Sequence, residues 1–212
     1  MSRPSNGPRA PRSNELPGAA QAGDVEGVAR LLDSGVPVDA VNDQARSALD
    51  LAVQENHVDV VRLLLAAGAD PALHAGYYHD HTPLTYAASL GHTPVVEALL
   101  DAGVSMRAQA DRIPYTPLVT AASSNHTGTV DLLAERGADL EDRAMKGRTA
   151  LEWASCFGHV EAVRRLLGHG AEATPRAFEC ARRHAGRDEE KRHRYERIAD
   201  DLRAARAFGS AT

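Results

Sequence analysis

The stretch TPLTYAASLGHTPVVEALLDAG, from Thr82 to Gly103, decides the fold because the chain repeats its pattern. It aligns without gaps with SALDLAVQENHVDVVRLLLAAG, from Ser47 to Gly68. Three further copies run from Asn14 to Gly35, from Thr116 to Gly137 and from Thr149 to Gly170. The closing glycines follow one another at intervals of 33, 35, 34 and 33 residues. A period of this length is typical of helical repeat arrays.

Each copy of the pattern predicts a helix, a turn and a second helix. Thr82-Pro83 places a side-chain oxygen at a helix N-cap and a proline at the first helical position, where its missing N–H is not needed. The same start occurs at Thr116-Pro117 and at Thr174-Pro175. Gly91 or Asn125 follows the first helix, and both residue types accept the left-handed conformation that ends a helix. Apolar residues at helical spacing then predict the second helix, which ends at the closing glycine.

These residues and their spacing resemble the ankyrin repeat over about residues 14–186. The resemblance implies an all-α repeat solenoid, a stack of helix–turn–helix units with β-hairpin-like fingers between them and a C-terminal helical cap. One such unit cannot bury its apolar face alone, so neighbours stabilise each other and the two ends need caps. The five expected repeats are residues 14–41, 42–74, 75–108, 109–141 and 142–173.

Both ends of the chain are expected to differ from its middle. Residues 1–13 are rich in Pro, Arg and Ser and lack an apolar core, which predicts a disordered arm rather than a signal peptide. Thr174 follows the fifth copy too soon to leave room for a finger, so we expect capping helices over residues 174–207 and a flexible tail over 208–212. The apolar stripe of the last helix is predicted to be Tyr195, Ile198, Ala199 and Leu202.

Composition favours a soluble, cytoplasmic protein, and we expect a monomer. The formal net charge is −5, and no apolar run approaches the roughly 20 residues that cross a membrane. Cys156 and Cys180 are too few for a disulfide framework, which suits a reducing compartment. Lysine occurs only at Lys146 and Lys191 among 24 basic residues, and this skew toward arginine is typical of a GC-rich bacterial genome.

The sequence argues against an enzyme and predicts no cofactor. Four of the ten histidines occupy one repeat position, and the ankyrin resemblance implies that they form framework hydrogen bonds between turns. They are His57, His92, His126 and His159. No glycine-rich phosphate loop, nucleophile elbow or HExxH helix occurs in the sequence.

Two other kinds of site remain open as alternatives. His74, His79 and His81, with Asp80, have the ligand types for zinc or nickel in the finger between the second and third repeats. The C-terminal third is locally basic, as at Arg164-Arg165 and around Lys191, which a nucleic-acid surface would need. Acidic residues interleave with those cations, however, so a solvated helix face is expected and nucleic-acid binding is not.

The ankyrin resemblance implies that a partner protein contacts the finger tips and the residues just before the turn between helices. In repeats 3–5 these positions hold residue types enriched at interface centres. The predicted partner-binding residues are Tyr78, His79, His81, Leu90, Arg112, Ile113, Tyr115, Met145, Arg148 and Phe157. In the competing interpretation these side chains pack on neighbouring fingers. Tyr86 and Trp153 are expected to lie in the core or to be partly buried. The predicted function is protein–protein interaction, as a scaffold, regulator or inhibitor.

Overall fold

The computed structural model describes residues 14–72, 81–107, 115–184 and 189–209. At Met145, His184, Phe208 and Gly209 it describes the backbone alone. The chain divides into two compact units, Met1–His79 and Asp80–Thr212. Regular structure in the described ranges is helical, and the β-structure found there consists of isolated bridges between Val41 and Ser47 and between Ala144 and Arg148. Each bridge pairs two residues of one finger, and each unit contains one such bridge.

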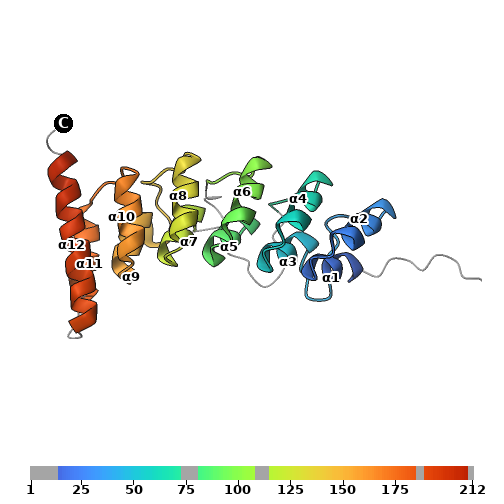
Figure 1. Ribbon diagram of the computed structural model, residues 1–212, viewed down its shortest axis with the longest axis horizontal. Coiled ribbons are helices and arrows are strands. Elements are labelled where there is room, and N and C mark those ends of the chain that lie inside the picture. The colour runs from blue at the N-terminus through green and yellow to red at the C-terminus, as the bar shows by residue number, and fades with distance from the viewer. Residues whose placement is uncertain (1–13, 73–80, 108–114, 185–188, 210–212) are drawn as a thin grey trace, which may run out of the picture. The chain divides into compact units, whose positions relative to one another are not determined.

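The first unit holds two helical hairpins. Helices α1 (Glu15–Gln21) and α2 (Val25–Asp33) form the first, and α3 (Ala48–Gln54) and α4 (Val58–Ala66) form the second. Helix α1 packs on α3, and α2 packs on α4 (Figure 1). The two hairpins therefore stack in parallel, as consecutive repeats.

The second unit holds three hairpins and two terminal helices. The hairpins are α5 (Pro83–Leu90) with α6 (Thr93–Asp101), α7 (Pro117–Ser123) with α8 (Thr127–Glu135), and α9 (Ala150–Phe157) with α10 (Val160–Gly168). Helices α11 (Pro175–His184) and α12 (Glu189–Gly209) follow. The first helices α5, α7, α9 and α11 pack in sequence against one another, while α12 packs on α10 and α11 (Figure 1). The predicted all-α repeat fold with a C-terminal helical cap is confirmed.

Helix starts follow the predicted capping residues. The side chains of Thr82, Thr116 and Thr149 each accept a hydrogen bond from the backbone N–H three residues later. At Thr149 the carboxylate of Glu152 also accepts from the N-cap N–H, which completes a capping box. Ser47 and Asp50 form the same arrangement in the first unit. Asp50 and Glu152 stand where the ankyrin pattern places a histidine, so here this position caps a helix.

The turn after the first helix needs glycine at Gly91. Its φ is 72°, in the left-handed region, and a Cβ atom there would lie 2.4 Å from Nδ1 of His126. Glycine therefore provides both the backbone conformation and the space for the histidine of the next repeat. Asn125 ends α7 with a φ of 61°, as the sequence predicts.

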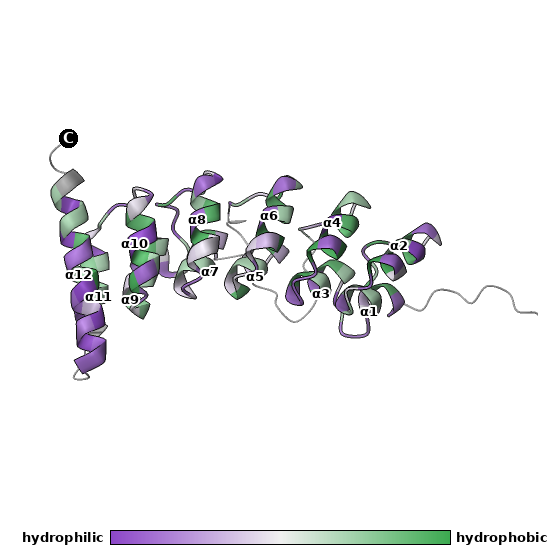
Figure 2. Cartoon of the chain, in the orientation of Figure 1, coloured by the Kyte–Doolittle hydropathy of each residue, from purple (hydrophilic) through white to green (hydrophobic). Residues whose placement is uncertain are grey.

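The core consists of small residues on the first helices and of leucines on both helices of every hairpin after the first. Ala52, Ala87 and Ala121 are fully buried, which allows neighbouring first helices to approach closely. The largest fully buried side chains include Leu51, Leu64, Leu84, Leu99, Leu133, Leu151 and Leu166. Figure 2 shows green, apolar stretches along the repeat helices, whereas the first half of α12 is mostly purple and hydrophilic. No helix in the described ranges has the length and apolar character that a membrane crossing requires.

Three of the four repeated histidines connect consecutive turns, as predicted. In the first unit, Nε2 of His57 donates to the carbonyl oxygen of Gln21 at 3.0 Å. In the second unit, His126 and His159 donate in the same way to Ser89 and Ser123, each at 2.9 Å. Burial is the main reason why the pKa of His159 is lowered. These rings are framework groups at all three positions.

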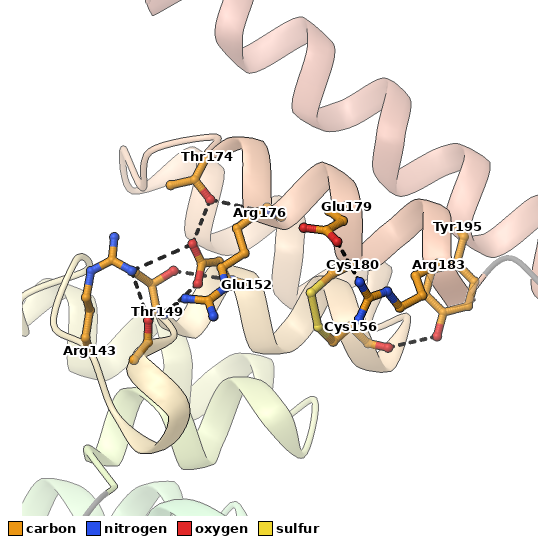
Figure 3. The surroundings of a disulfide bond; sticks show 12 residues. Arg143, Thr149, Glu152, Cys156, Thr174, Arg176, Glu179, Cys180, Arg183 and Tyr195 are labelled. Carbon is orange, nitrogen blue, oxygen red and sulfur yellow. Dashed lines mark hydrogen bonds and ion pairs between the residues drawn. A yellow bond between two sulfur atoms is a disulfide. The ribbon is translucent and has the colours of Figure 1, made fainter.

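Helix α12 covers the last repeat through the predicted apolar stripe. Ile198 and Leu202 are fully buried, and Tyr195 is nearly so. The hydroxyl of Tyr195 donates to the carbonyl oxygen of Cys156 at 3.0 Å, which joins α12 to the end of α9 (Figure 3). Burial raises the pKa of this hydroxyl.

A disulfide between Cys156 and Cys180 joins α9 to α11 (Figure 3). Two cysteines are too few for a disulfide framework, as expected, but they form one bond that the sequence did not predict. The residues lie 24 positions apart, and α11 brings them together because it packs directly along α9.

Candidate protein-binding surface

Three predicted contact residues precede the N-caps of α5, α7 and α9. They are His81, Tyr115 and Arg148, and they lie at one repeat position on three helices that pack side by side. The rings of His81 and Tyr115 stack with their centroids 5.2 Å apart and an angle of 16° between their planes. All three side chains are half-buried. This part of the surface is therefore partly fixed by contacts within the protein.

A second set of residues lies at the opposite ends of the same helices. Leu90 and Phe157 are the last residues of α5 and α9, and Ser124 follows the end of α7 at the equivalent position. Leu90 is 37% exposed and Phe157 is 49% exposed. Phe157 stacks on Trp153 with a centroid distance of 5.5 Å and an interplanar angle of 15°. One face of the Phe157 ring is thus held by the fold, while about half of the residue remains accessible.

The middle of the surface is formed by Tyr86, Thr120 and Trp153, which are predominantly buried. Trp153 is 7% exposed, as predicted for a core residue, and Tyr86 is half-buried. The guanidinium carbon of Arg148 lies 4.8 Å from the centroid of the Trp153 ring. His81 and Tyr86 make the corresponding contact in α5, with centroids 6.4 Å apart. In both cases the residue before the N-cap packs on the fourth residue of the helix, the spacing of a hydrophobic staple.

The ten predicted contact residues thus have different outcomes. Leu90 and Phe157 are exposed, whereas His81, Tyr115 and Arg148 pack on neighbouring side chains, in line with the competing interpretation. Tyr78, His79, Arg112 and Ile113 lie outside the described residues, and the side chain of Met145 does as well.

The sequence-based prediction missed the importance of Lys146 and Trp153. The backbone of Lys146 is left-handed, with a φ of 63°, and its ammonium nitrogen lies 6.0 Å from the centroid of Trp153. We define the Trp153 cluster as Lys146, Arg148, Trp153 and Phe157. The contact between Arg148 and Trp153 could have been predicted, because the two residues have the sequence spacing of a hydrophobic staple. The position of Lys146 could not, because it depends on the 3-10 turn Met145–Gly147.

The structure describes the two alternative sites to different extents. His74 and His79 lie outside the described residues, and within the described ranges no group of three possible ligands could hold a metal ion. Several cations near the C-terminus pair with carboxylates: Arg164 with Asp201, Arg165 with Asp131 and Glu161, Arg183 with Glu179, and Arg194 with Glu190. These ion pairs fit the solvated helix faces that the sequence predicts.

Comparison with known families identifies the repeats. The family model for ankyrin repeats, which spans three copies, matches residues 16–110, 71–144 and 109–177. Because these matches cover most of the chain, the protein belongs to the ankyrin repeat family. Ankyrin repeats are generally protein–protein interaction modules and are typically non-catalytic.

Individual relatives agree with this assignment. The chain is 32% identical over 147 residues to human ankyrin repeat domain-containing protein 63, covering 69% of this chain and 30% of that protein. It is 34% identical over 93 residues to the mouse inactive serine/threonine-protein kinase TEX14, covering 44% of this chain and 6% of that protein. The crystal structure of the human ASB11 ankyrin repeat domain superposes with a TM-score of 0.74, covering 93% of this chain and 84% of that one at 22% identity, and shows the fold alone. The chain thus matches less than a third of each of these two sequence relatives.

Proposed function

We propose that this protein is a non-enzymatic interaction module that binds a partner protein through the surface formed by the first helices and finger ends of the second unit. Leu90, Phe157, the stacked pair His81–Tyr115, and Arg148 contribute to this surface. Binding at this surface would scaffold, regulate or inhibit the partner. A cytoplasmic location, a bacterial origin and a monomeric state remain proposals from the sequence.

The exposure of Leu90 and Phe157 is the observation that carries the proposal. Val25 and Val41 are the other large hydrophobic residues that are exposed in the described ranges, and both lie in the first unit. Leu90 and Phe157 instead occupy one repeat position, on two helices that both pack on α7. Packing of the repeats does not require an apolar side chain there, because Ser124 occupies the same position after α7. Apolar groups recurring at exposed equivalent positions are typical of a binding surface.

The test is affinity capture from a lysate of the source organism with Leu90→Ser/Phe157→Ser. Truncating a central interface anchor commonly costs about 2 kcal/mol, or about thirtyfold in affinity, so we expect the captured partner to be lost. The melting temperature should change little, because both residues are exposed. Val25→Ser/Val41→Ser is the matched control, since it also removes two exposed apolar side chains. Capture that survives the first change, or is lost equally with the control, would contradict this surface.

A further inference from the structure

We infer that the Trp153 cluster recognises a carboxylate of the partner, presented by an acidic segment that also carries an apolar residue. The inference rests on the proposed function and specifies the chemistry of the partner. It follows from the charges around the cluster, from its buried hydrogen-bond donors and from the exposed ring beside them.

Four cations lie on and around the 3-10 turn Met145–Gly147. Lys146 and Arg148 belong to the Trp153 cluster. Arg143 and Arg176 flank it, and each donates a hydrogen bond to the carbonyl oxygen of Gly147 at 3.0 Å. The whole chain carries a formal net charge of −5, so this basic turn is a local departure from an acidic protein. Opposite charge on the partner would steer association toward the turn.

The carboxylates near the turn are already engaged or face elsewhere. Glu152 is 1% exposed, accepts from the hydroxyl of Thr174 at 2.8 Å and lies 3.9 Å from Arg143 (Figure 3). Glu141 accepts from the backbone N–H of Glu172. Asp142 lines a separate cavity together with Arg107. These contacts leave Lys146 and Arg148 without a carboxylate within ion-pair distance in the described part of the chain.

Arg148 and Trp153 each hold a buried N–H that lacks an acceptor among the described residues. The atoms are Nε of Arg148 and Nε1 of Trp153, in side chains that contact each other. Buried donors without acceptors are costly, and a partner that supplied oxygen atoms would remove this cost once the half-buried Arg148 side chain moved to admit them. Both groups are donors only, so the complementary group must be an acceptor. Beside a lysine and an arginine, a carboxylate is the acceptor that also balances the charge.

Phe157 specifies the second feature of the partner segment. Its ring stacks on Trp153 and is 49% exposed, so it presents an apolar surface next to the indole ring of Trp153. A leucine, isoleucine or valine next to the carboxylate would cover this surface. The predicted partner segment therefore combines Asp or Glu with an adjacent aliphatic residue.

The test uses the full chain and defined peptides as probes. A peptide array combining Glu and Asp with Leu, Val and Ile is compared with an array in which Gln and Asn replace the acidic residues. The best binders are then titrated while the emission of Trp153 is recorded, because Trp153 is the chain's one tryptophan and lies in the cluster. We expect the acidic peptides to change this emission and to bind at least about tenfold more tightly than their amide counterparts.

Variants then assign the preference to the cluster. Arg148→Gln/Lys146→Asn should weaken the acidic peptides by about tenfold or more, while Arg192→Gln/Arg197→Gln, which removes two exposed cations from α12, should leave them unchanged. Should the first variant fold poorly, Lys146→Asn alone serves, since asparagine accepts a φ of 63°. The inference would be overturned if the acidic peptides did not bind, or if they bound no more tightly than the amide peptides. It would also be overturned if the cluster variant bound the acidic peptides as tightly as the wild type does. Partner capture that still depends on Leu90 and Phe157 would then leave the proposed function standing.

Discussion

His159 connects two neighbouring repeats through one hydrogen bond, and the burial of its ring makes the stability of the protein depend on pH at this position. Its Nε2 donates to the carbonyl oxygen of Ser123, and the ring is partly buried at the start of α10. Burial, and to a smaller extent the charge of Arg194, lowers the pKa of the ring. The folded protein therefore favours neutral His159, whereas the unfolded chain takes up a proton near the ordinary histidine pKa of about 6.5.

This difference predicts a loss of stability in mild acid. Because the unfolded chain binds the proton more readily, the contribution of His159 is complete above about pH 6.5 and declines as the pH falls below that value. We expect the melting temperature to fall less between about pH 7.5 and pH 5.5 in His159→Gln than in the wild type. His193→Gln is the control, because that ring lies exposed on α12. Parallel pH profiles for wild type and His159→Gln would contradict the assignment.

Single residues differ in how far the sequence predicted their roles. The N-cap threonines, the left-handed Gly91 and the framework histidines could all be predicted, because each depends on neighbours within the repeat period. The capping boxes of Asp50 and Glu152 follow an equally local pattern, because each carboxylate lies three residues after its N-cap. Contacts of Glu152 with Thr174 and Arg143 could not be predicted, because they depend on how α11 and the finger pack on α9.

At the scale of elements, α9 makes the most varied contacts in the second unit. It packs on α7, α10 and α11, carries the disulfide to α11 and receives the hydroxyl of Tyr195 from α12. The same helix holds Trp153 and Phe157 of the proposed binding surface. The cap and the binding surface thus share one short helix.

The disulfide should stabilise the packing of α11 on α9. It closes a loop between residues 24 positions apart, and cross-links over such loops typically contribute about 2–4 kcal/mol. We expect Cys156→Ala/Cys180→Ala to lower the free energy of unfolding of the second unit by an amount in this range, measured by urea denaturation followed by circular dichroism. Adding a thiol reductant should produce most of this loss in the wild type and none in the variant. A wild type whose unfolding is insensitive to reduction would show that packing alone holds the cap.

The helices could be predicted from the sequence, whereas the pairing of the cysteines could not, and the difference has a physical reason. Helix starts at Pro83, Pro117 and Pro175 follow from caps that lie within a few residues. The Cys156–Cys180 pair depends on the direction in which α11 leaves the last repeat, and neither cysteine carries a local signal for it. The same holds for the proposed site, where the exposed residues could be predicted but the Trp153 cluster as a unit could not.

At the scale of the whole molecule, stability is local because each repeat contacts its neighbours. Within the second unit α5 packs on α7, α7 on α9, and α9 on α11, while α8, α10 and α12 form the second series. In such an array the stability is roughly a sum of repeat and interface terms, and terminal elements protect the apolar side of the repeat beneath them. The buried Val163 and Leu166 of α10 and the buried Ile198 and Leu202 of α12 are the apolar parts of this last interface.

Removal of residues 173–212 should therefore destabilise the last repeat first. The truncation deletes α11 and α12, and so exposes the apolar side of α9 and α10 and removes the disulfide. We expect faster amide hydrogen exchange in α9 and α10 than in α1–α4, together with self-association detectable by light scattering. Deleting residues 1–13 is the control and should leave the melting temperature unchanged, because their composition cannot supply an apolar core. A truncated protein that stayed monomeric, with an unchanged melting curve and normal protection in α9 and α10, would show that α11 and α12 are not a stabilising cap.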